Sequence, residues 1–279
     1  MSSTAAVLDH VRDVLRNGGV DSVEIEARWL LEAAAGRTRS ELALQPELDA
    51  SVEQRALEYA QRRAEGEPLQ YVTGEAGFRR LTLAVGPGVF VPRPETELVA
   101  EKAMERLPDG GTLVDVGTGS GAIALSVADE RPDARVVATE ISPEALEWVH
   151  KNRAALDSNV EIIRTDLLDG LPEELQGRVD VIVSNPPYVA DTQRTTLPAD
   201  IVDHEPHVAL FGGQAGTDAI ERLVADAREW LRPGGWLVLE MGVAQADDVK
   251  DLLDRLDYED ITVGVDYADW PRVIQGRRP

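Results

Sequence analysis

The sequence predicts an α/β protein, in which a seven-stranded, mostly parallel sheet with helices on both faces follows a small helical bundle. The first observation is that short β-branched runs alternate with stretches of helical periodicity from Glu95 onward. The second is that the last two runs leave no room for a helix between them, so we expect the seventh strand to enter antiparallel, as a hairpin. The third is that residues 1 to about 66 show helical patterns alone.

Four helices are expected in the N-terminal region. The first has one apolar face and ends at Gly18, and Ser22 precedes the acidic first turn of the second. Thr38 and Glu41 have the spacing of a capping box at the start of a short third helix. The fourth is expected over about 51–65. The apolar face of the first helix consists of Val7, Leu8, Val11, Val14 and Leu15.

A hairpin is expected to connect this bundle to the sheet. Apolar residues from Phe78 to Val85 sit among turn residues, as is typical of two short paired strands. We therefore divide the chain into a helical domain (1–73), a β-hairpin connector (74–94) and an α/β domain (95–279). The candidate strands of the α/β domain, the first six of them separated by helical stretches, are Thr112–Val116, Arg135–Thr139, Val160–Arg164, Val179–Ser184, Gly235–Glu240, Ile261–Val265 and Arg272–Gln275.

Charge and composition exclude several classes of function. The 279 residues carry 51 acidic and 28 basic side chains, a net charge of -23, which argues against nucleic acid as a direct partner. The absence of cysteine excludes disulfides and thiolate chemistry. The sequence contains no run of 18 apolar residues, so no membrane span is predicted. The charged start of the chain does not resemble a signal peptide, and we therefore expect a cytoplasmic protein.

The first motif with chemical meaning is a glycine-rich turn between a strand and a helix. Gly117, Gly119 and Gly121 alternate with Thr118 and Ser120 directly after the first strand. Glycines let the backbone approach a ligand closely and turn sharply into the helix. The spacing differs from the dinucleotide fingerprint and suits a nucleoside with an amino-acid tail better than a pyrophosphate.

The ends of the next two strands support this interpretation. Glu140 ends the second strand, where a carboxylate can accept hydrogen bonds from both hydroxyls of a ribose. Asp166 follows the third strand, at a place suited to contacts with an adenine edge, and Leu167 offers an apolar surface to the ring.

The decisive motif is Asn185-Pro186-Pro187-Tyr188, directly after the fourth strand. The two prolines stiffen the loop and remove two N–H donors, which leaves the Asn185 side-chain oxygen and the Pro186 carbonyl as acceptors. Two acceptors suit a planar –NH2 group conjugated to a carbonyl or an aromatic ring, and Tyr188 would stack on its plane. Such acceptors also stabilise positive charge that develops on the nitrogen when it acts as a nucleophile.

Together these motifs resemble the bacterial release-factor glutamine methyltransferases, and the resemblance extends over the whole chain. The segment from Pro68 to Gly74 is similar to a signature at the end of that family's N-terminal domain. Arg93, Glu95 and Thr96 lie in a segment similar to the family's PRPETE motif, beside the cofactor pocket. The glycine loop, the Asn-Pro-Pro-Tyr motif, Glu205-Pro206 and Glu240-x-Gly also match.

The resemblance implies a class I, Rossmann-like S-adenosylmethionine-dependent methyltransferase fold and transfer of a methyl group to the glutamine of the Gly-Gly-Gln motif in class 1 peptide-chain release factors. It implies that Gly117–Gly121, Glu140, Asp166, Leu167 and Asn185 bind cofactor. Asn185–Tyr188 would bind the glutamine, with Asn185, Pro186 and Tyr188 in catalytic roles. Arg93, Glu95 and Thr96 would close the pocket, and the helical domain would recognise the protein substrate. No metal is implied.

Three other functions remain open from the residues. An amino-group DNA adenine methyltransferase uses a similar loop, although the net charge argues against it. A glutamine methyltransferase acting on a ribosomal protein is a closer alternative; Pro94–Glu97 favours the release-factor branch. A non-catalytic cofactor-binding scaffold would not need the acceptors of the Asn185–Tyr188 loop.

Overall fold

The computed structural model describes residues 2–44 and 46–279, which form two compact units. The first unit comprises Met1–Glu75 together with Pro198–His204, and the second comprises Ala76–Leu197 and Glu205–Pro279. No helix in the described part of the chain is long and apolar enough to cross a membrane.

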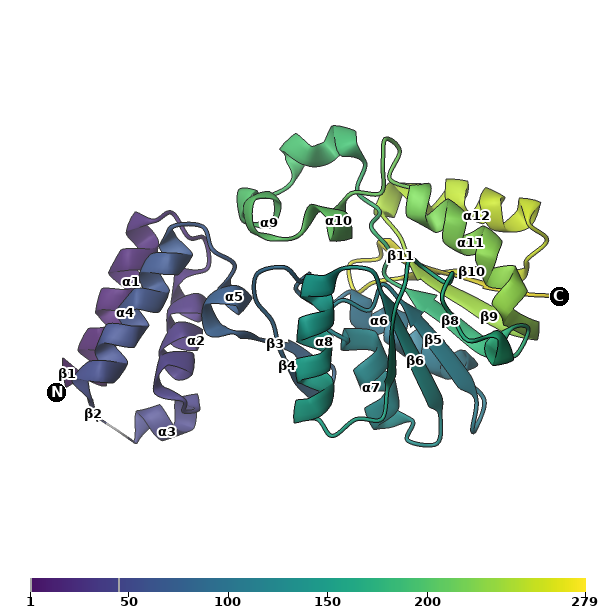
Figure 1. Ribbon diagram of the computed structural model, residues 1–279. Helices are drawn as coiled ribbons and strands as arrows, with labels where there is room; N and C mark the ends of the chain where they lie inside the picture. Colours follow the sequence, from purple (N-terminus) through teal and green to yellow (C-terminus); the bar gives the residue numbers. More distant parts are fainter. Residues whose placement is uncertain (1, 45) are drawn as a thin grey trace. The chain divides into compact units, whose positions relative to one another are not determined.

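The first unit is a helical bundle (Figure 1). The capping box is confirmed, because the Thr38 hydroxyl and the Glu41 carboxylate each accept the other's backbone N–H. The side chain of Arg63 bonds to Glu26 at 2.7 Å and approaches Asp200 at 3.6 Å, which links the segment 198–204 to the bundle. The helices and short strands of this unit are α1 (Thr4–Asn17), α2 (Val23–Ala35), α3 (Arg39–Ala43), α4 (Ala50–Ala64), α5 (Leu69–Thr73), α9 (Ala199–His204), β1 (Ser2–Ser3) and β2 (Glu47–Leu48).

The second unit contains a seven-stranded sheet in the order β10-β11-β9-β8-β5-β6-β7. In this sheet β11 pairs antiparallel with both β9 and β10, so the expected terminal hairpin is confirmed. The other pairs of neighbouring strands in the sheet are parallel. The strands are β5 (Thr112–Val116), β6 (Arg135–Glu140), β7 (Glu161–Arg164), β8 (Val179–Ser184), β9 (Leu231–Glu240), β10 (Glu259–Val265) and β11 (Pro271–Arg277).

Helices cover both faces of this sheet (Figure 1). Successive strand residues point to opposite faces: Leu113 packs with α6 and α7, while Val114 packs with α11 and α12. Strands buried on both faces explain the β-branched, nearly continuous apolar runs in the sequence. The helices are α6 (Thr96–Arg106), α7 (Ala122–Glu130), α8 (Pro143–Ala155), α10 (His207–Leu210), α11 (Asp218–Trp230) and α12 (Ala246–Arg255).

One expectation about the connections is wrong. The segment between β7 and β8 contains only a short 3-10 helix, η1 (Glu173–Leu175), instead of the expected helical stretch. Gly170 and Pro172 interrupt the segment, and its leucines Leu168, Leu171 and Leu175 pack directly into the core. Two further 3-10 turns, η2 (Asp191–Thr196) and η3 (Val243–Gln245), lie in later connections.

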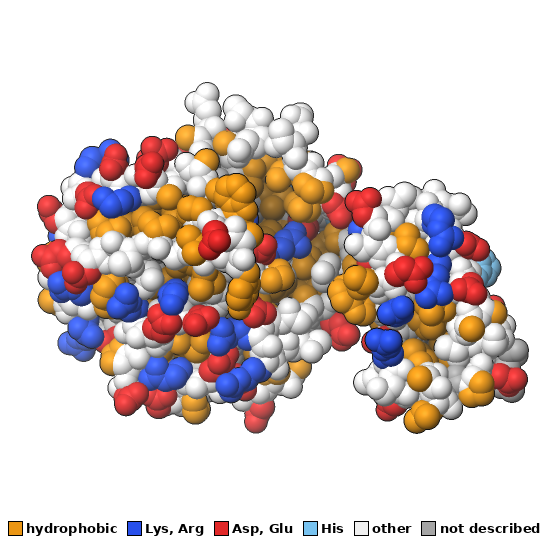
Figure 2. Space-filling model, turned by 180° about the vertical axis from the view of Figure 1, so that it is seen from behind, with side chains coloured by type: hydrophobic (Ala, Val, Ile, Leu, Met, Phe, Trp, Pro, Cys, Tyr) orange, Lys and Arg blue, Asp and Glu red, His pale blue; other side chains and the backbone are white. Residues whose placement is uncertain are grey.

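The connector hairpin is present as β3 (Glu75–Phe78) and β4 (Leu81–Ala84). Arg79 at its turn bonds to the Glu130 carboxylate, and Asn152 of α8 bonds to both backbone groups of Ala84. Phe78 is buried in the core of the second unit. Figure 2 shows mixed acidic and basic side chains over the surface of the larger unit, with hydrophobic side chains gathered in a hollow.

Candidate active site

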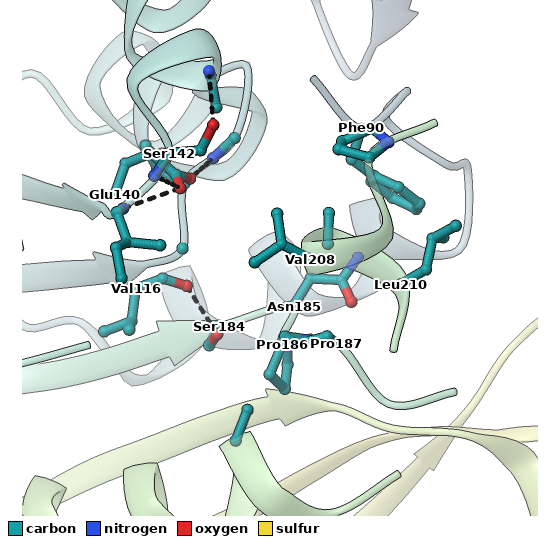
Figure 3. A pocket seen from close by; sticks show the side chains of 18 of the residues that line it. Phe90, Val116, Glu140, Ser142, Ser184, Asn185, Pro186, Pro187, Val208 and Leu210 are labelled. Carbon is teal, nitrogen blue, oxygen red and sulfur yellow. Dashed lines mark hydrogen bonds between the residues drawn. The ribbon is translucent and has the colours of Figure 1, made fainter. Parts of the chain in front are cut away.

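A cavity of about 500 Å3 lies at the carboxyl ends of β5, β6 and β8. The chain continues from β5 to β6 on one side, whereas β8 pairs with β5 on the other, so the cavity lies at the point where strand order reverses. In Figure 3, Asn185 lies between Glu140 and Ser142 at one end and Phe90 and Leu210 at the other. The site residues expected from the sequence that line the cavity are Thr96, Gly117–Ser120, Glu140, Asp166, Leu167 and Asn185–Tyr188.

The glycine loop has the backbone conformation that its residues allow. Gly117, Gly119 and Gly121 have φ values of 69°, 57° and 89°, a region that favours glycine. A Cβ at Gly117 would meet no heavy atom within 4 Å, so the loop borders open space there. A Cβ at Gly121, at the N-cap of α7, would instead meet Leu125 at 2.7 Å and Val149 at 2.9 Å.

Glu140 is fixed against this loop. One carboxylate oxygen accepts the backbone N–H of Gly119 at 2.8 Å, and the other accepts those of Ile141 and Ser142, both at 2.9 Å. The residue is 7% exposed and lines the cavity. These three backbone donors fix the orientation of the carboxylate at the cavity wall. Figure 3 shows hydrogen bonds of Glu140 beside Ser142.

A second buried carboxylate, which the sequence did not single out as a site residue, lies beneath the loop. Asp115 accepts hydrogen bonds from the Thr118 hydroxyl at 2.6 Å and from the backbone of Ala124 at 3.0 Å. Burial raises the pKa of Asp115 to about 7. The sequence could have indicated this residue, because Asp115 is the acidic residue in the otherwise apolar run Leu113–Val116.

The residues after β7 also face the cavity. Asp166 forms an ion pair of 2.9 Å with Arg222 of α11, which itself lines the cavity. Leu167 has a φ of 47°, unusual for a non-glycine residue. This conformation is part of the sharp turn after the strand, where Asp169 and Leu171 make turn hydrogen bonds.

The Asn185 side chain is oriented by two buried residues from other elements. Its amide nitrogen donates to the Thr96 hydroxyl at 3.1 Å, and that hydroxyl donates to the Glu240 carboxylate at 2.7 Å. Thr96 and Glu240 are 4% and 1% exposed. This bond fixes the orientation of the Asn185 amide, and Asn185 lines the cavity.

Tyr188 is held by hydrogen bonds at its side-chain hydroxyl and at its backbone carbonyl. Its hydroxyl donates to Glu240 at 3.3 Å, and its backbone carbonyl accepts from the side chain of Gln245 at 3.0 Å. Burial raises the pKa of the Tyr188 phenol, so the ring remains neutral. The backbone of Val189 pairs with Leu210 and Gly212, which anchors the end of the loop.

Arg93 and Glu95 are not among the described residues that line the cavity. The guanidinium of Arg93 bonds to Glu205 and lies 4.9 Å from the ring centre of Phe90, which does line it. Glu95 is the N-cap residue of α6. An apolar wall that the sequence did not single out completes the cavity with Phe90, Pro92, Val208, Leu210 and Phe211.

Comparison of the sequence with known proteins identifies the family of this chain. Residues 6–74 match the family "PrmC N-terminal domain", and residues 81–214 match "Methyltransferase small domain". The release factor glutamine methyltransferase of Koribacter versatilis is 39% identical over 262 residues, which cover 92% of each chain. That of Moorella thermoacetica is 43% identical over 272 residues, covering 95% of this chain and 94% of the relative. The chain belongs to the release factor glutamine methyltransferase family.

Solved structures agree on the fold. A methyltransferase from Pyrococcus furiosus superimposes with a TM-score of 0.55 at 22% identity, covering 70% of this chain and 88% of that one. A Thermus thermophilus 16S rRNA N2 G1207 methyltransferase gives a TM-score of 0.54 at 24% identity, covering 74% and 50% of the two chains. The class I methyltransferase fold expected from the sequence is thereby confirmed.

As a member of this family the chain is an S-adenosylmethionine-dependent protein methyltransferase. The residues of the cavity fit that cofactor. Gly117 leaves open space beside the loop, Glu140 presents a fixed carboxylate, and the volume is in the range of small-molecule sites.

Proposed function

We propose that the protein transfers a methyl group from S-adenosylmethionine to the side-chain amide nitrogen of the glutamine in the Gly-Gly-Gln motif of class 1 release factors. The observation that carries the proposal is the fixed Asn185 amide. Its nitrogen is engaged by Thr96, so its oxygen is the acceptor available to an –NH2 group at the cavity.

The proposal assigns cofactor binding to the glycine-loop end of the cavity. Gly117–Gly121, of which Gly117–Ser120 line the cavity, would lie along the amino-acid part. Glu140 would bind the ribose, and Asp166 with Leu167 would contact the adenine. S-adenosylmethionine supplies, when bound, a methyl group that is already activated on a sulfonium.

The residues of the Asn-Pro-Pro-Tyr loop would bind and orient the substrate amide. The Asn185 oxygen and the Pro186 carbonyl would each accept one of its hydrogens, and the Tyr188 ring would lie against its plane. Holding the substrate nitrogen and the methyl group in the correct geometry can lower the activation barrier by about 7–11 kcal/mol. The two acceptors further stabilise positive charge that develops on the nitrogen in the transition state.

The helical domain 1–73 is proposed to recognise the release factor. Deleting residues 1–66 is expected to weaken release-factor binding more than cofactor binding, measured by calorimetry on both ligands. A larger loss for the cofactor would contradict this assignment. Because release factors act on the ribosome, the proposal expects a cytoplasmic enzyme with no direct nucleic-acid, membrane or metal partner.

A substrate competition tests the proposal against its two enzymatic alternatives. Wild-type protein and labelled S-adenosylmethionine are incubated with an unmethylated release factor, ribosomal protein and adenine-containing DNA, together and separately. We expect label in the release factor alone, because relatives over nearly the whole chain are named for that substrate. Label in the ribosomal protein or in DNA, with none in the release factor, would overturn it.

A further inference from the structure

Three side chains from distant parts of the sequence form one hydrogen-bonded chain that runs from the cavity wall into the protein. Glu240 at the end of β9 accepts from Thr96 at the start of α6, at 2.7 Å, and Thr96 accepts from Asn185 after β8, at 3.1 Å. Thr96 and Asn185 both line the cavity, while Glu240 lies behind them, 1% exposed.

The direction of these hydrogen bonds follows from the atoms available. The Thr96 hydroxyl has a single hydrogen, which it donates to the Glu240 carboxyl at 2.7 Å. The Thr96 oxygen is then left to accept, and only the –NH2 end of the Asn185 amide can donate to it. A threonine that donated to Asn185 instead would stabilise the flipped amide, with its –NH2 facing the cavity.

Glu240 also accepts a hydrogen bond from Tyr188, the last residue of the Asn-Pro-Pro-Tyr loop. Its second oxygen accepts the Tyr188 hydroxyl at 3.3 Å. Burial raises the pKa of Glu240 to about 7, and Glu95 acts in the same direction. Arg272 of β11, which is paired with Asp266 at 2.9 Å, favours the charged form of Glu240. One buried carboxylate therefore holds two members of the Asn-Pro-Pro-Tyr loop.

We propose that Thr96 and Glu240 are positioning residues that select the orientation of the Asn185 amide and thereby select substrates that donate an –NH2 group. The inference rests on the proposed function and deepens it. A glutamine amide can donate two hydrogens, one to the Asn185 oxygen and one to the Pro186 carbonyl. An ionised glutamate side chain has no hydrogen to donate, so its oxygens would face these two acceptor oxygens without a hydrogen bond. Thr96 and Glu240 would therefore cause the enzyme to reject a Gly-Gly-Glu sequence, although neither residue touches the reacting atoms.

Thr96→Val and Thr96→Ser form the matched pair that tests this. Valine keeps the shape and removes the hydroxyl, and serine keeps the hydroxyl. We expect Thr96→Val to lower kcat on the release factor by about tenfold to a hundredfold, with cofactor affinity within about threefold of wild type. Thr96→Ser should recover kcat to within about threefold of wild type, and Glu240→Gln should lower kcat without changing cofactor affinity.

A readout independent of activity is the 15N NMR signal of the Asn185 side-chain amide, assigned by its absence in Asn185→Ala. In wild type one of its hydrogens should exchange slowly because it is bonded to the buried Thr96. Thr96→Val should abolish that protection, and Thr96→Ser should keep it.

Full kcat in Thr96→Val, or an equal loss in both Thr96 variants, would overturn the positioning role. So would unchanged amide protection in Thr96→Val. A wild-type protein that methylates no release factor but shows this protection pattern would contradict the proposed function while the amide orientation stands.

Discussion

The side chain of Gln245 donates to the backbone carbonyl of Tyr188 at 3.0 Å and to that of Gly216 at 3.1 Å. Its own oxygen accepts the backbone N–H of Gly242 at 2.8 Å. Gln245 thus ties the end of the Asn-Pro-Pro-Tyr loop to two other segments, and it is not among the described residues that line the cavity. The two prolines and this side chain together restrict the Asn-Pro-Pro-Tyr loop, which we propose binds the substrate amide.

Replacing Gln245 with Ala should therefore loosen the loop without touching either ligand. We expect kcat to fall by about tenfold, because misplacement of an orienting loop is costly for transfer reactions. The melting temperature should fall modestly, since the neutral hydrogen bonds contribute about 1 kcal/mol each. Steady-state kinetics and thermal melting measure the two effects, and wild-type kcat in a variant with a lowered melting temperature would contradict the link between them.

Asn185→Ala removes the acceptor itself. Turnover is expected to fall by about a hundredfold or more, as with loss of one transition-state partner, while cofactor affinity stays within a few-fold of wild type. Single-turnover kinetics and calorimetry separate the two quantities. An unchanged rate would remove Asn185 from the mechanism.

Gly121→Ala tests the glycine loop. The new Cβ would lie 2.7 Å from Leu125 and 2.9 Å from Val149, at a φ of 89°. We expect a loss of about 2 kcal/mol or more in the free energy of unfolding, with weaker cofactor binding, because overpacking adds to the backbone strain.

Gly110→Ala is the matched control for this substitution. Gly110 also has a positive φ, 66°, but its Cβ would meet nothing within 4 Å, and it precedes β5, whereas the glycine loop follows that strand. It should cost about 1 kcal/mol from strain alone and leave cofactor affinity unchanged. Equal effects of the two substitutions on affinity would contradict a specific role for the loop.

The ionisation of Glu240 should be visible in the pH dependence of stability. Burial raises the pKa of Glu240 to about 7, so the folded protein holds this proton more tightly than the unfolded chain does. The resulting stabilisation is complete below the unfolded pKa, near 4.5, and is lost as the pH rises through about 7. The carboxyl faces Thr96, Tyr188, Arg272 and Glu95.

Glu240→Gln removes this titration and leaves that of Asp115, whose pKa is also about 7, in both proteins. The free energy of unfolding of the variant minus that of wild type should therefore increase by about 2–3 kcal/mol between pH 5 and pH 8. Chemical denaturation at several pH values measures it. A flat difference would mean that the proton affinity of Glu240 does not change on folding.

The fold could be predicted from the sequence because its signals are local. Runs such as Val181–Val183 are apolar on both faces, and the spacing of the last two strands permits only a hairpin. Local signals failed between β7 and β8, where leucines at helical spacing pack into the core from a turn. They also gave no indication that 198–204 joins the helical unit, which depends on tertiary contacts such as that of Arg63 with Asp200.

The site could be predicted only as far as its residues lie in motifs. Glu140 and the loop at Asn185 were identifiable because each follows a strand at the carboxyl edge of the sheet. The contact of Thr96 with Glu240 spans 144 residues and that of Asn185 with Thr96 spans 89. No local pattern encodes such pairs, so the sequence placed Thr96 at the pocket without showing what it binds.

The central claim is methyl transfer to one amide nitrogen, and peptide mass spectrometry tests it most directly. A recombinant, unmethylated release factor is incubated with S-adenosylmethionine and either the wild-type protein or Asn185→Ala, then digested. The account predicts a mass gain of one methyl group on the glutamine of the Gly-Gly-Gln peptide with wild type, and little or none with the variant. An unmodified Gly-Gly-Gln peptide, or equal modification by both proteins, would contradict it.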